Sequence, residues 1–178
     1  IHLEKAALFF ANENLPYPDK YLSNLAMAKD ICEFIIDEYP DTKTSESAKS
    51  ILSAILKKEY NIDFENTTLP GKPFRGKISF KNINSIHLHI LKLENDIFSF
   101  SIMNEQDYDS LLNTPPALKF SVELPLVPDY LTHSVEFPVE GLSNGKYLII
   151  TYTEEENQKT LFSHNTLSVT GISYFYMK

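Results

Sequence analysis

His87 and His89 are the side chains whose spacing could most directly do chemistry. Two residues apart on a β-strand, both imidazoles would lie on one face, which is how some zinc sites begin. His133 and His164 could supply a third ligand if their strands are adjacent. The alternative, which the sequence favours, is that both histidines occupy the solvent face of a strand whose other face is apolar. We therefore expect no metal, no other cofactor and no catalytic residue.

Of two groups of acids, one could suggest a calcium site. Glu105, Asp107 and Asp109 form a cluster, but a calcium loop needs more oxygen ligands at alternating positions and usually a glycine, which this segment lacks. Acids favoured at the start of a helix explain the cluster better. The glutamates at 154–156 lie between two strand-like runs and are interpreted as a solvated hairpin loop.

Cys32 is the single cysteine, so no internal disulfide can form. Its neighbours Ile31, Phe34 and Ile35 place it in an apolar helical run, where cysteine behaves as a small buried hydrophobe. A cysteine nucleophile needs a nearby histidine or a positive helix end, and the sequence shows neither beside it. Phosphate-binding glycine loops, a nucleophile elbow and paired CxxC motifs are absent as well.

Composition narrows the class of protein. A chain of 178 residues with 43% hydrophobic content suits one or two compact domains rather than disorder. The formal net charge of -8 argues against nucleic acid or anionic lipid as the main partner, because both bind a basic face. No apolar run approaches the roughly 20 residues of a membrane span. Because the chain begins inside a helix-like run without methionine, we expect it to be part of a longer parent.

Apolar residues recur with a helical period through residues 1–60. We expect three amphipathic helices that fold back on one another as antiparallel neighbours. The first has Leu3, Ala7 and Phe10 on its apolar stripe and is ended by Pro16 and Pro18. The second opens near Asp19 and closes at Pro40, and the third is capped by Ser45.

From Asn61 onward the apolar period changes to two, which is typical of strands, and turn residues such as Asn144-Gly145 separate the runs. A short helix or turn is expected at 104–112, and Tyr174 and Tyr176 are interpreted as part of a strand with two packed faces rather than a ligand platform. The pattern predicts an antiparallel sandwich or barrel over residues 61–178. The strand candidates are 62–69, 74–80, 85–93, 118–124, 134–139, 147–152 and 160–176, the last with a possible break near Gly171.

Two segments resemble a known family. Residues 69–80, LPGKPFRGKISF, and 117–152, ALKFSVELPLVPDYLTHSVEFPVEGLSNGKYLIITY, are similar to the first macroglobulin-type domain of Bacteroidetes α2-macroglobulin-like proteins. The helices before them, with AKDICEFIIDEYP at 28–40, resemble the tetratricopeptide-like lead-in of these proteins, since Ala28 and Pro40 have the spacing of that repeat. The positions that follow the family order are Leu124-Pro125, Asp129-Tyr130, His133, Glu136 and Gly145-Lys146-Tyr147.

The resemblance implies a tetratricopeptide-like helical region over 1–60 and a seven-stranded, fibronectin- or immunoglobulin-like antiparallel β-sandwich over 61–178. It also implies a large exported parent in the periplasm or cell envelope. Members of the family trap or inhibit proteases, some through a Cys-Gln thioester. Glu105-Gln106 has no cysteine shortly before it and no bait segment is identifiable, so no active residue is carried over.

We therefore expect a non-catalytic structural module. Its expected partners are neighbouring macroglobulin domains of the same parent chain and, through the parent, proteases. A stand-alone sandwich that binds a glycan or protein ligand is the alternative, and a metal-dependent enzyme using His87 and His89 is a third hypothesis.

Overall fold

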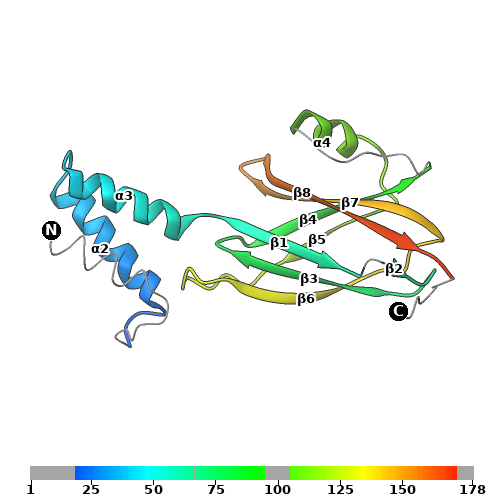
Figure 1. Cartoon of the computed structure of the whole chain (residues 1–178), viewed down its shortest axis with the longest axis horizontal. Helices are drawn as coiled ribbons and strands as arrows, with labels where there is room; N and C mark the ends of the chain where they lie inside the picture. Colours follow the sequence, from blue (N-terminus) through cyan, green and yellow to red (C-terminus); the bar gives the residue numbers. More distant parts are fainter. Residues whose placement is uncertain (1–18, 66, 95–104, 172–178) are drawn as a thin grey trace, which may run out of the picture. The chain divides into compact units, whose positions relative to one another are not determined.

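The computed structural model of the chain describes residues 19–65, 67–94 and 105–171. Within these residues three helices and eight strands follow one another (Figure 1). The helices are α2 (Asn24–Glu38), α3 (Lys43–Leu56) and α4 (Glu105–Leu112). The strands are β1 (Glu59–Phe64), β2 (Thr67–Thr68), β3 (Phe74–Lys81), β4 (Ser85–Leu93), β5 (Leu118–Glu123), β6 (His133–Val139), β7 (Gly145–Glu155) and β8 (Gln158–Val169).

The chain divides into two compact units. The described part of the first, the helical unit, comprises residues 19–60, 80–82 and 125–133. The described part of the second, the sheet unit, comprises residues 61–79, 83–124 and 134–171 apart from the gaps above. The first boundary lies at the change of period near Asn61, but two short segments from the strand-rich sequence belong with the helices.

Hydroxyl caps decide where α2 and α3 begin. The Ser23 hydroxyl accepts a hydrogen bond from the Ala26 amide at 3.0 Å, so α2 starts at Asn24 and not near Asp19. The cap of α3 is Thr42, whose hydroxyl accepts from the Ser45 amide at 3.1 Å. The expected cap at Ser45 is wrong, because Ser45 already lies in the first turn and supplies the donor. The first expected helix, before Pro16, lies outside the described residues.

Two apolar clusters hold the helical unit together. Cys32, Ile35 and Ala48 are fully buried where α2 packs on α3. The second cluster joins buried residues of both helices to Tyr130 and Leu131 from the segment after β5. Each fully buried aliphatic side chain stabilises such a core by about 1.5–3 kcal/mol. Tyr130 and Leu131 therefore attach the 125–133 segment to the helical core, although Leu126 in the same segment is 75% exposed.

Asn82, the residue after β3, caps the C-terminal end of α3. Its side-chain amide donates to the carbonyls of Ile55 at 2.8 Å and Lys57 at 3.0 Å. These carbonyls have no partner within the helix because α3 ends there. Asn82 has a φ of 57°, a left-handed conformation that asparagine tolerates better than most residues.

The strands form two sheets, ordered β1-β3-β6 and β2-β8-β7-β4-β5. The pairs β4·β5, β4·β7 and β7·β8 are antiparallel, whereas β2 runs parallel to β8. The expected α+β class with helices preceding a two-sheet β region is confirmed. The expected seven antiparallel strands are wrong: eight strands are described, and the candidate 62–69 contains both β1 and β2, which belong to different sheets.

The remaining strand candidates fall close to observed strands. The candidate 85–93 coincides with β4, and those at 74–80, 118–124 and 134–139 differ from β3, β5 and β6 by one residue. The strands β7 and β8 are joined by a two-residue turn, since Glu155 pairs with Gln158. Both turn residues, Glu156 and Asn157, have positive φ, as a primed hairpin turn requires. The expected hairpin is thus present, but of the three glutamates only Glu156 lies in the turn, since Glu154 and Glu155 belong to β7. The part of 160–176 beyond 171 lies outside the described residues.

Apolar side chains from both sheets form the core of the sheet unit. Ile78, Phe137 and Val139 of the three-stranded sheet are 0–6% exposed, as are Leu88, Ile90 and Ile149 of the five-stranded sheet. The rings of Phe120 on β5 and Phe137 on β6 lie 6.2 Å apart between centroids. This packing of two sheet faces is the arrangement of a β-sandwich.

The helix α4 covers the outer face of the five-stranded sheet. Tyr108 of α4 packs with Leu91, Leu148 and Ile150, and the leucines at 111 and 112 extend the contact. As a result, residues 147–153 of β7 are buried without interruption. No helix in the described ranges has the length and apolar character to cross a bilayer.

We expect Gly76→Ala to destabilise the sheet unit by about 1–3 kcal/mol, because the added methyl overpacks the core. A Cβ at position 76 would lie 2.6 Å from Cε1 of Phe137 and 2.9 Å from Cε1 of Phe64. Chemical denaturation measures the effect. Gly171→Ala is the matched control, since its Cβ would meet nothing within 4 Å. Equal midpoints for the two variants would contradict the packing described here.

Candidate functional site

The histidines of β4 lie on the outer face of the five-stranded sheet, and the structure uses both for packing. His87 stacks on Tyr152 with ring centroids 5.2 Å apart, and its Nδ1 lies 2.9 Å from the Ser121 hydroxyl. His89 is only 2% exposed, and its Nε2 lies 3.0 Å from the Thr114 carbonyl. The expectation of a solvent-facing pair is wrong for His89, because α4 and the segment after it cover this face.

The surroundings of His89 favour its neutral form. Burial lowers the pKa of His89, the hydrogen bond to the Thr114 carbonyl opposes that effect, and the charges of Lys119 and Lys159 lower the pKa further. Since a carbonyl only accepts, Nε2 must carry the proton and donate it. The buried Nδ1 has no hydrogen-bond partner among the described residues.

The other two histidines do not complete a metal site. His164 lies in the same row as His89, but Ile150 separates them across the sheet. Its Nδ1 lies 2.8 Å from the Tyr108 hydroxyl. His133 belongs to the helical unit and contacts Asp129. Across the described ranges, no three side chains of His, Cys, Asp or Glu are grouped so that they could hold a metal ion.

The remaining chemical candidates have structural positions. Asp107 and Asp109 lie in α4, which confirms the short helix expected there. Cys32 is fully buried between α2 and α3, and burial raises the pKa of its thiol. This confirms the interpretation of Cys32 as a small buried hydrophobe rather than a reactive thiolate.

Asp129 is the polar centre of the segment that completes the helical core. It is 7% exposed, and its Oδ1 accepts the Leu131 amide at 2.9 Å. Both carboxylate oxygens lie within 3.0 Å of His133 Nε2, and the Ser23 hydroxyl donates to the Asp129 carbonyl. Tyr130, between Asp129 and Leu131, has a φ of 62° and packs against the helices. We call residues 129–133, held in this way, the Asp129 turn.

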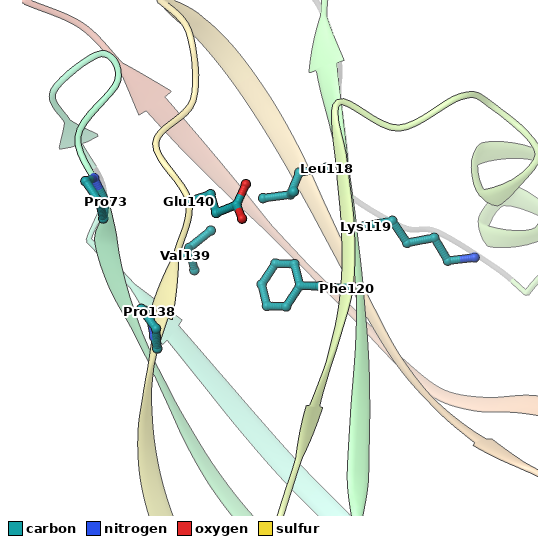
Figure 2. A pocket seen from close by; sticks show the side chains of 7 residues that line it. All are labelled: Pro73, Leu118, Lys119, Phe120, Pro138, Val139 and Glu140. Carbon is teal, nitrogen blue, oxygen red and sulfur yellow. The ribbon is translucent and has the colours of Figure 1, made fainter.

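A pocket of about 420 Å³ opens between β5 and β6, each of which is one of the two edge strands of its sheet. Figure 2 shows Leu118, Phe120 and Val139 projecting toward one space, with the Glu140 carboxylate at the same space and the Lys119 side chain directed away. Pro73 and Pro138 complete the lining. Sequence reasoning missed this pocket, because no sequence signal states which strands of two separate sheets end up facing each other.

No protein-family model and no curated protein matches this chain. Among solved structures, the CARDB domain of the PF1109 protein from Pyrococcus furiosus, solved in complex with di-metal ions, has 14% identity and a TM-score of 0.36 over 64% of this chain and 88% of its own. A superoxide reductase (neelaredoxin) from Ignicoccus hospitalis has 15% identity and a TM-score of 0.35 over 68% and 87%. The PmoD soluble domain from Methylocystis sp. has 16% identity and a TM-score of 0.30 over 64% and 90%. Likeness at this level assigns neither a family nor an activity to the chain.

We expect the free energy of unfolding to fall as the pH drops from about 6.5, the ordinary pKa of histidine, toward the lower pKa of folded His89. In that pH range His89 is protonated in the unfolded chain but not in the folded chain, so the free energy of unfolding falls by at most about 1.4 kcal/mol per pH unit. His89→Gln supplies an amide N–H donor that does not titrate, so the free energy of unfolding, measured by denaturation at each pH, should vary less with pH. His87→Gln, on the same face, should retain it. Equal slopes in both variants would disprove the assignment to His89.

We expect Asp129→Ala to destabilise the chain by about 1–3 kcal/mol, because the Leu131 amide loses its acceptor and His133 its carboxylate. Thermal and chemical denaturation measure the loss. Glu136→Ala is the control: it removes a carboxylate 61% exposed that pairs with Arg75 at the surface, a contact worth under about 1 kcal/mol. Similar losses in both variants would contradict a structural role for the Asp129 turn.

Proposed function

We propose that the chain is a non-catalytic structural and interaction module of a large α2-macroglobulin-like protein of the periplasm or cell envelope. The observation that supports this proposal is the use made of the residues that carry the family resemblance. Leu124, Asp129 and Tyr147 among them are only 1–7% exposed, and Tyr130 packs against the helical core. These positions therefore serve the packing and the backbone conformation of the chain.

The Asp129 turn is the first of these family-like positions. The Asp129 carboxylate accepts the Leu131 amide and contacts His133, while Tyr130 packs against the helical core. Such contacts fix the conformation of the long connection between β5 and β6. A scaffold needs defined connections of this kind, because neighbouring domains can only pack reproducibly on a surface with a fixed shape.

The start of β7 holds the second set of family-like positions. Gly145 has a φ of 152°, outside the range that most residues adopt, and Tyr147 is 1% exposed. The Tyr147 hydroxyl donates to the Ser143 carbonyl at 2.8 Å, so its polar atom is satisfied within the sheet unit. Leu124, a further family-like position, is buried as well, and its amide donates to the Asn84 carbonyl at 2.8 Å.

In the proposed role, each unit acts as a packed body that contacts sibling macroglobulin domains. Two packed sheets deform little, so a displacement at one surface is passed on to the next contact rather than absorbed. The partners proposed for the chain are those neighbouring domains and, through the parent, proteases.

Cross-linking mass spectrometry of the intact parent, before and after addition of an active protease, tests this role. Cross-links from exposed lysines of this chain to other domains should change after proteolysis, while amide exchange of the buried strand β7 stays constant. Inhibited protease is the control. A parent without further sandwich-like segments, or cross-links that active protease leaves unchanged, would refute the proposal.

An exposed aromatic pair favours the second candidate, a stand-alone ligand-binding module. Phe34 and Tyr39 are 50% and 48% exposed, and their rings lie edge to face with centroids 6.5 Å apart. Exposed aromatic rings can stack on sugars or pack on a protein. Specific binding of the purified chain on a glycan array, abolished by Tyr39→Ala, would support this candidate; silence across the array would count against it.

A further inference from the structure

We propose that the free edge of β5, together with the pocket beside it, binds an extended peptide segment that carries a Lys or Arg side chain. This inference goes beyond the proposed function and holds whether or not the parent is α2-macroglobulin-like. It rests on the hydrogen-bonding pattern of β5, the difference between the two edge strands, and the charge in the pocket.

Three residues of β5 direct their backbone groups to the open edge. Within the described residues β5 pairs only with β4, and the amide of Leu124 donates to Asn84 in that ladder. Hydrogen-bonded and non-hydrogen-bonded pairs alternate along an antiparallel ladder. Leu118, Phe120 and Val122 therefore bond to β4, whereas the N–H and C=O groups of Lys119, Ser121 and Glu123 point away from it. These groups are free to pair with another strand.

The facing edge strand is less suitable for such pairing. β6 is the edge of the three-stranded sheet in the described part of the chain, and Pro138 near its end has no N–H to donate. Proline is a common device that protects an edge from added strands. β5 contains no proline. An extended segment that enters the space between the sheets would therefore pair with β5.

Charge determines the kind of segment. An incoming strand would direct alternate side chains into the pocket, opposite Leu118 and Phe120, where the Glu140 carboxylate also lies (Figure 2). No ion pair of Glu140 occurs among the residues that the structure describes. A Lys or Arg side chain fits this combination, because its methylene stem packs on apolar residues while its charged end meets a carboxylate. The net charge of -8 would attract a basic segment in addition.

The pocket is large enough for this purpose. Its volume of about 420 Å³ lies in the range of small-molecule sites, and it exceeds the space of a single side chain. An apolar residue opposite Phe120 and a basic residue opposite Leu118 can therefore occupy it together. The proposed ligand is an extended segment in which an apolar residue precedes a basic residue by two positions.

The probe is a fluorescent peptide, Thr-Val-Thr-Val-Thr-Arg-Thr, whose Val and Arg residues face the pocket when it pairs antiparallel with β5. Fluorescence anisotropy on the full chain should show saturable binding. Glu140→Gln should weaken binding about tenfold, the factor that corresponds to one charge-assisted hydrogen bond. A peptide with Glu in place of Arg should bind at least as weakly to the wild-type chain. No saturable binding of the Arg peptide, or equal binding of both peptides, would overturn the proposal.

Backbone pairing is tested with two variants of one residue. Lys119→Pro removes an N–H that points to the open edge and should abolish binding, whereas Lys119→Ala keeps that N–H and should bind within about twofold of the wild type. Hydrogen exchange provides a measurement that does not depend on the proline variant folding. Bound peptide should slow exchange at the amides of Lys119, Ser121 and Glu123, and leave those of Phe120 and Val122 unchanged. Unaltered exchange at the first three amides would overturn the proposal.

Discussion

The five-stranded sheet has apolar side chains on both faces of its central strands, and the rest of the sheet unit is arranged around this constraint. Residues 147–153 of β7 are buried without a break, and Leu88 to Leu91 of β4 are 0–5% exposed. One face packs on the three-stranded sheet, and α4 covers the other through Tyr108. A single layer of strands could not keep both faces from water, so a two-layer sandwich with an added helix follows.

The same constraint explains the histidines. On a face covered by a helix the two imidazoles cannot both stay hydrated, so each histidine makes a different set of contacts. His87 stacks on Tyr152, and buried His89 donates from Nε2 to the Thr114 carbonyl. The imidazoles are therefore packing elements that tolerate partial burial, since each can satisfy a hydrogen bond while it presents a flat ring to its neighbours.

The edges of the sandwich differ in how open they are. β2 covers the outer side of β8 with two residues, whereas β5 has no second neighbour in the described part of the chain. Edge strands are where a sheet can accept a partner chain. The proposed interaction module and the proposed peptide site at β5 are thus separate hypotheses. Both place the contacts of the sandwich at its periphery rather than in its core.

Local pattern determined much of this protein from the sequence alone. The change of period near Asn61, the strand at 85–93, the short helix at Glu105–Leu112 and the burial of Cys32 all follow from the spacing of apolar residues. What the tertiary structure decided concerns residues distant in sequence: the division of 62–69 between two sheets, the entry of Tyr130 into the helical core, the cover over His89, and the pocket between β5 and β6. A periodic pattern states that one face of an element is buried, but not which element buries it, because burial is a relation between surfaces that only the folded chain brings together.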